Sequence, residues 1–184
     1  MFPVNVPNVL TVLRILLVPV LVVALLDATP SGDLMAAIVF VVASLTDLLD
    51  GYLARTRNAV TTFGKLMDPV ADKLLIVAAL VALVSLDRLA AWVAMVIIGR
   101  ELSVTAMRMA AAGQGVVIPA NALGKLKTCL QIAAVLALIA SGRDAPLGVD
   151  LLVDATVVVT VLSGADYFLG LRRRLGARET ERAA

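Results

Sequence analysis

The chain contains no histidine and a single cysteine, Cys129, among its 184 residues. These absences exclude imidazole acid–base chemistry, a zinc site built from Cys and His, and an internal disulfide. Any metal ion must therefore be bound by oxygen ligands. Charge is also scarce, because only 16% of the residues are Asp, Glu, Lys or Arg, whereas 61% are hydrophobic.

The mean hydropathy of +0.99 exceeds what a soluble domain of this length needs to fill one core. We therefore expect an all-α integral membrane protein with six transmembrane helices. The apolar runs lie at residues 9–26, 34–49, 73–86, 89–107, 127–141 and 151–169. The second, third and fifth runs fall well short of the roughly 20 residues that cross a bilayer, so their helices should continue into polar ends. The breaker clusters at 29–33 and 141–146 predict loops, as does the segment 111–123.

Basic residues predict the orientation, because Lys and Arg near helix ends stay on the cytoplasmic side. With both termini cytosolic, only Arg88 and Arg143 of the 16 basic residues fall outside. We therefore expect a multi-pass protein of the inner or plasma membrane whose basic face suits anionic headgroups and phosphorylated substrates. The sequence predicts one domain over residues 1–184, with residues 171–184 as a polar, frayed cytosolic tail.

Four carboxylates occur in one short stretch, although each charge at a bilayer centre costs roughly 2.5 to 3.5 kcal/mol. Residues three or four apart share a helix face, so two stripes of acids and small residues are expected on consecutive helices. The stretch contains Asp47, Asp50, Gly51, Ala54 and Arg55, then Gly64, Asp68 and Asp72. Such oxygen ligands suit Mg²⁺ or Mn²⁺, and two ions could clamp a phosphoryl group.

Two other interpretations of the acidic stretch are open. The acids could be ion-paired with Arg55, Lys65 and Lys73, with the small residues serving only helix packing. They could also mark an ion or proton pathway, although such a pathway would place acids at mid-membrane rather than near one face. A divalent-cation transporter is the corresponding alternative function.

The acidic stretch resembles the CDP-alcohol phosphotransferase signature, D-x-x-D-G-x-x-A-R-x8-G-x-x-x-D-x-x-x-D, at every defined position. The resemblance implies a six-helix, homodimeric membrane enzyme that transfers a substituted phosphate from a CDP-linked donor to an alcohol and releases CMP. It implies two divalent cations, Mg²⁺ or Mn²⁺, bound by Asp47, Asp50, Asp68 and Asp72, with Asp72 also the general base. The implied CDP pocket comprises Asp47, Gly51, Ala54, Arg55, Gly64 and Asp68.

Further segments resemble family members that use sn-glycerol 3-phosphate as acceptor and CDP-diacylglycerol as donor. These segments are Asn5 to Thr11 with Arg14, Thr62 to Lys73, Gly99 to Leu102 with Arg108, and Gly124 to Thr128 with Gln131. The alternatives within the family are a cardiolipin synthase, which takes phosphatidylglycerol, and a phosphatidylinositol phosphate synthase. The expected partners are these substrates and membrane lipids, and no nucleic acid.

Four basic residues support a phosphorylated acceptor independently of the resemblance, because clustered Arg and Lys bind a phosphate dianion. They are Arg100, Arg108, Lys125 and Lys127. The same residues could instead anchor the cytosolic face, and Lys127 could snorkel to the membrane surface. Glu101 is expected to orient Arg100, and Arg14 to lie either near the nucleotide or at the interface.

Overall fold

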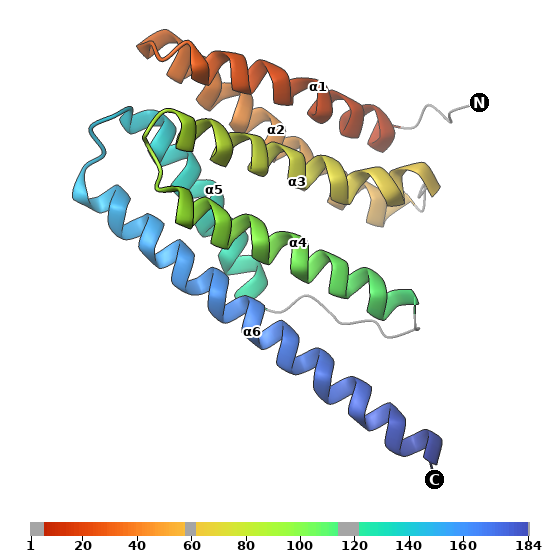
Figure 1. The fold of residues 1–184 in the computed structure, drawn as a ribbon. Coiled ribbons are helices and arrows are strands. Elements are labelled where there is room, and N and C mark those ends of the chain that lie inside the picture. The colour runs from red at the N-terminus through yellow and green to blue at the C-terminus, as the bar shows by residue number, and fades with distance from the viewer. Residues whose placement is uncertain (1–5, 58–61, 114–121, 184) are drawn as a thin grey trace. The chain divides into compact units, whose positions relative to one another are not determined.

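The computed structural model describes the backbone of residues 6–57, 62–113 and 122–183, and the side chains of residues 9–46, 73–113 and 122–174. The described backbone forms six helices and the turns between them, which confirms the all-α architecture and the predicted number of helices. The helices are α1 (Val6–Leu26), α2 (Pro30–Arg57), α3 (Thr62–Ser85), α4 (Ala91–Gly113), α5 (Ala122–Ser141) and α6 (Leu147–Ala183) (Figure 1).

Three helices contain segments that are long and apolar enough to cross a membrane, judged on the described residues. These segments are Val9–Leu26, Ala122–Ser141 and Leu147–Arg174. Shorter apolar segments occupy Pro30–Thr46 in α2 and Lys73–Ser85 in α3. Both helices continue beyond these segments into the acidic stretch, as the short apolar runs predicted.

The chain divides into two compact units. The first comprises Met1–Ala90 with Val135–Pro146, and the second comprises Ala91–Ala134 with Leu147–Ala184. In the first unit α1 packs against both α2 and α3 (Figure 1). Its core contains fully buried apolar side chains from all three helices, including Leu25, Phe40 and Leu83. In the second unit α4 packs against α6.

The connection between α1 and α2 is shorter than the breaker cluster predicted. Thr29 caps α2, because its Oγ1 accepts a hydrogen bond of 3.0 Å from the Gly32 N–H, and Pro30 occupies the first helical position. Residues 30–33 therefore form the first turn of α2 rather than a loop. A Cβ at Gly32 would lie 2.6 Å from the Ala24 carbonyl oxygen, so only glycine permits this close approach to α1.

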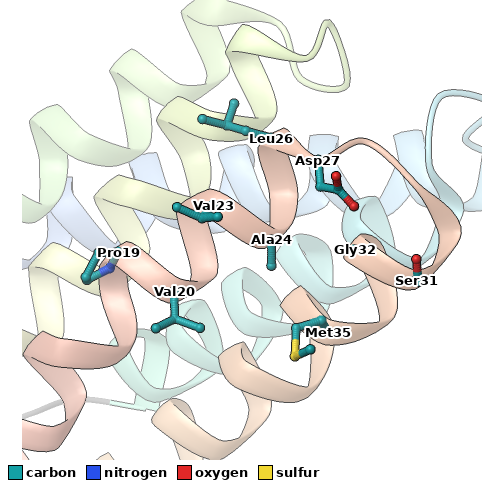
Figure 2. A pocket seen from close by; sticks show the side chains of 9 residues that line it. All are labelled: Pro19, Val20, Val23, Ala24, Leu26, Asp27, Ser31, Gly32 and Met35. Carbon is teal, nitrogen blue, oxygen red and sulfur yellow. The ribbon is translucent and has the colours of Figure 1, made fainter.

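A shallow apolar groove follows this close approach on the outside of α1 and α2. Figure 2 shows the nine residues that line it, with Pro19, Val20 and Val23 on α1 and Met35 on α2. Val20, Val23 and Met35 are all more than 40% exposed. An apolar surface of this kind suits a helix that faces lipid rather than water.

Two further boundaries differ from the prediction. Residues 111–113 end α4 and residues 122–123 begin α5, so the predicted loop 111–123 is wrong at both ends; residues 114–121 lie outside the described part. The predicted fraying of the tail is also wrong, because α6 continues to Ala183. Its last turns are rich in Arg, Glu, Leu and Ala, which favour helix on their own.

Candidate active site

The four predicted metal-binding aspartates belong to two consecutive helices, and the structure describes their backbone. Asp47 and Asp50 belong to the last turns of α2, and Asp68 and Asp72 to the first turns of α3. Only residues 58–61 separate the two helices. A helix rises about 1.5 Å per residue, so Asp50 and Asp68 lie at similar distances along their helices from this connection. The same holds for Asp47 and Asp72.

The side chains of this stretch lie outside the described residues, and so do those of the other predicted CDP-binding residues, Gly51, Ala54, Arg55 and Gly64. The helical backbone nevertheless fits the predicted chemistry, because it gives each pair of aspartates the three- or four-residue spacing that shares one face. Among the side chains that the structure does describe, no group of three or more Asp, Glu, His or Cys could hold a metal ion.

Arg14 lies inside the first unit, on the face of α1 that also carries Thr11 and Leu21. Its side chain is 1% exposed, and Thr11 is equally buried. Both have a hydrogen-bonding or electrostatic partner. A fully buried arginine does not reach the membrane surface, so the interface alternative for Arg14 is wrong.

Glu101 lies at the centre of a buried ionic cluster in the second unit. Its Oε1 accepts a hydrogen bond of 3.0 Å from Nη1 of Arg100 on the same helix and another from Nζ of Lys127 on α5. The side chains of Glu101 and Lys127 are each 5% exposed. The snorkelling alternative for Lys127 is therefore wrong, and Glu101 orients two cations rather than only Arg100.

Helix α6 faces this cluster with a polar stripe that the sequence analysis missed. The stripe consists of Thr156, Thr160, Ser163 and Tyr167, all of them buried. Arg100 Nη2 donates to Ser163 Oγ. Thr156 Oγ1 donates to the Leu152 carbonyl of its own helix at 2.7 Å and lies 3.4 Å from the Leu130 carbonyl of α5. These residues are spaced by four, three and four positions, which puts them on one face of the helix. This spacing of hydroxyl side chains could have been recognised in the sequence.

The other two predicted acceptor-binding residues lie apart from the Glu101 cluster. Arg108 is exposed, and its guanidinium lies 5.6 Å from the centre of the Tyr167 ring, within range of a cation–π contact. Lys125 is exposed and has no ion pair among the described side chains. It is two residues from Lys127, so the two lysines do not share a face of α5.

Comparison with known proteins identifies the family. Residues 4–165 match the family described as CDP-alcohol phosphatidyltransferase. The chain belongs to this family. A CDP-alcohol phosphatidyltransferase is an enzyme of the transferase class, so the transporter alternative is set aside. The match includes the four aspartates and the four basic residues, whereas Tyr167 lies beyond its end.

Relatives of this CDP-alcohol phosphatidyltransferase carry consistent names. The chain is 44% identical over 180 residues to a Bacillus subtilis protein named CDP-diacylglycerol–glycerol-3-phosphate 3-phosphatidyltransferase, covering 89% of this chain and 93% of the relative. A Rickettsia felis protein with the same name is 34% identical, covering 92% and 96%. A Mycobacterium tuberculosis H37Rv protein named probable phosphatidylglycerophosphate synthase is 40% identical, covering 94% and 84%.

Proposed function

We propose that this protein is a phosphatidylglycerophosphate synthase. It transfers the phosphatidyl group of CDP-diacylglycerol to sn-glycerol 3-phosphate and releases CMP. The names of its relatives support this reaction over 89% or more of the chain. The same names favour glycerol 3-phosphate over phosphatidylglycerol or inositol phosphate as the acceptor.

The observation that carries the choice of acceptor is the Glu101 cluster. The carboxylate of Glu101 holds two cations, Arg100 and Lys127, side by side and away from water. Clustered Arg and Lys bind a phosphate dianion. An acceptor without a phosphate would not need both cations. Arg108 and Lys125 extend the positive surface toward the ends of α4 and α5.

The acidic stretch supplies the rest of the proposed chemistry. Asp47, Asp50, Asp68 and Asp72 would hold two Mg²⁺ or Mn²⁺ ions, because their helical spacing and oxygen-only ligands suit hard cations. Bound divalent ions neutralise the charge of the donor pyrophosphate. Gly51, Ala54 and Gly64 would leave room for the CDP group, which Asp47, Asp68 and the guanidinium of Arg55 would contact.

Asp72 would act as the general base, since the chain has no histidine and carboxylates are the natural alternative. Its carboxylate takes the proton of the glycerol 3-phosphate hydroxyl. That oxygen forms a bond to the phosphorus that carries diacylglycerol, and the bond from this phosphorus to the CMP oxygen breaks. CMP leaves with the electron pair of that bond.

The proposal includes six spans, both termini in the cytosol, a homodimer, and an active site on the cytosolic side of the cell membrane. The exposed apolar surfaces of α1 and α2 and the distribution of basic residues support this topology. Reporter fusions after Ala28, Arg57, Asp87 and Arg143 test it. A cytosolic reporter signal is expected only from the fusion after Arg57.

The decisive experiment measures CMP release by the purified full-length protein with CDP-diacylglycerol and Mg²⁺. The acceptors compared are glycerol 3-phosphate, phosphatidylglycerol, inositol phosphate and none. Release is expected only with glycerol 3-phosphate, and chelation with EDTA should abolish it. Release that requires a different acceptor would overturn the proposal while leaving the family intact.

The Asp72→Asn variant tests the role of Asp72 as general base separately from donor binding. The variant should lose at least about a hundredfold in kcat, because general-base catalysis contributes roughly 10²- to 10⁴-fold. The affinity of the variant for the donor should change less. It is measured by letting the variant compete with the wild-type enzyme for labelled CDP-diacylglycerol. A variant that retains wild-type kcat would remove Asp72 from the mechanism.

A further inference from the structure

Two arginines of α4 reach α6 at neighbouring positions. Arg100 and Arg108 lie eight residues apart on α4, which separates their backbones by about 12 Å. On α6, however, Arg100 contacts Ser163 and Arg108 lies over Tyr167. Ser163 and Tyr167 are only four residues apart, or about 6 Å along the helix. The two arginines of α4 therefore contact α6 on adjacent turns.

Gly164 makes the Arg100 contact possible. A Cβ at position 164 would lie 3.2 Å from Cγ of Arg100, so the missing side chain leaves space for the arginine stem. Ser163, Gly164 and Tyr167 thus give α6 a surface that fits both arginines, and a guanidinium presents a planar set of donors to a phosphate.

The hydroxyl of Tyr167 has no hydrogen-bond partner among the residues that the structure describes. Tyr167 is 7% exposed, and its hydroxyl oxygen is among the buried polar atoms without a partner, as is Nε of Arg100. A buried hydroxyl without a hydrogen-bond partner destabilises the fold. A side chain that served only packing would not need the hydroxyl. A phenylalanine would fill the same space and offer the same ring face to Arg108.

We propose that Tyr167 binds the phosphate of the acceptor, with its hydroxyl donating to a phosphate oxygen and its ring positioning Arg108. Arg100, held by Ser163 and Glu101, approaches the same phosphate from the adjacent turn of α6. The ligand class is a phosphate monoester, and the proposal rests on the proposed function. Tyr167 lies outside the segment that matches the family, so it extends the acceptor site beyond the matched residues.

The test compares Tyr167→Phe with the wild type in the full-length protein. Three quantities are measured: the KM for glycerol 3-phosphate, the KM for CDP-diacylglycerol, and the melting temperature. Loss of a hydrogen bond to a charged group corresponds to about a tenfold or greater rise in the acceptor KM. The donor KM should stay within about twofold. The melting temperature should not fall, because the hydroxyl has no partner among the described residues.

Two further variants complete the design. Tyr167→Leu also removes the ring that faces Arg108, so its acceptor KM should rise beyond that of Tyr167→Phe. Phe168→Leu is the matched control, because Phe168 is the next residue on α6 and is 54% exposed. Its acceptor KM should equal that of the wild type. A Tyr167→Phe variant with the wild-type acceptor KM would overturn the proposal, and so would an equal rise in both KM values.

A binding measurement distinguishes failure of this proposal from failure of the proposed function. Calorimetric titration with glycerol 3-phosphate and with inorganic phosphate, without any CDP-lipid, reports anion binding directly. If the wild type released no CMP with glycerol 3-phosphate, the proposed function would fail. Weaker phosphate binding by Tyr167→Phe would then still support the anion site, whereas equal binding would overturn it.

Discussion

Two buried ionic groups of this protein differ in how their charges balance. In the first unit, Nη1 of Arg88 donates to Oδ1 of Asp33 at 2.6 Å, and the two side chains are 4% and 17% exposed. One cation meets one anion there. In the second unit, two cations meet the single carboxylate of Glu101. The first group is a balanced pair, whereas the second holds two cations on one carboxylate.

The surroundings of the two ionic groups also differ. The Arg88–Asp33 pair joins the start of α2 to the turn between α3 and α4, and helix-ending hydrogen bonds such as Arg88 N–H to the Leu83 carbonyl surround it. The Glu101 cluster faces the hydroxyl stripe of α6, where Thr160 Oγ1 and Tyr167 Oη have no partner among the described residues; Nε of Arg88, in the balanced pair, lacks one as well. A balanced pair among capped helix ends indicates a structural role. Two cations held beside buried hydroxyl groups indicate a site for an anion.

The largest effect is expected from Glu101→Gln, which removes the carboxylate that Arg100 and Lys127 share. Breaking a buried ion pair by removing one partner costs about 3–5 kcal/mol. Thermal unfolding in detergent should show a large drop in the melting temperature. The acceptor KM should rise as well, because both cations lose their fixed positions. Wild-type stability in this variant would show that Glu101 does not organise the cluster.

Lys127→Met tests the second cation of the cluster. Arg100 still donates to Glu101 in this variant, so the melting temperature should fall less than in Glu101→Gln. The acceptor KM should rise about tenfold or more, because a hydrogen bond to a charged group is worth about 1.5–3 kcal/mol. Lys125→Met is the matched comparison, since Lys125 is exposed, and its effect should stay below about threefold. Equal effects of the two substitutions would show that position within the buried cluster does not matter.

The sequence predicted the helices and the position of the acidic stretch better than it predicted the side-chain contacts of the proposed acceptor site. Apolar runs and helical spacing are local signals, so the six helices and the positions of the four aspartates within them followed directly. The role of Lys127 depends on Glu101, which is 26 residues away, and that of Ser163 depends on Arg100, which is 63 residues away. Such pairings arise from helix packing. A hydroxyl stripe in an apolar helix shows only that something polar lies opposite.

Arg88→Met should have the opposite profile to Lys127→Met. It leaves Asp33 partly buried without its cation, so the free energy of unfolding should fall by about 1–3 kcal/mol. Both KM values should remain within about twofold of the wild type, because the pair takes no part in substrate binding. Thermal unfolding and steady-state kinetics on the same preparation check this. A selective rise in the acceptor KM would contradict the distinction between the two ionic groups.

The smallest effect is expected from Gly142→Ala, at the turn that ends α5. Gly142 has φ +63°, a left-handed conformation that costs a residue with a Cβ about 1–2 kcal/mol. The added Cβ would itself meet little, since its nearest neighbour, Oδ2 of Asp33, is 3.9 Å away. The variant should therefore lose about 1 kcal/mol of stability through backbone strain alone. Gly148→Ala is a control for the change to alanine, because Gly148 is helical and nothing lies within 4 Å of its Cβ position. If Gly142→Ala altered the acceptor KM, the turns around the balanced pair would influence the binding site, and a purely structural role for that region would be wrong.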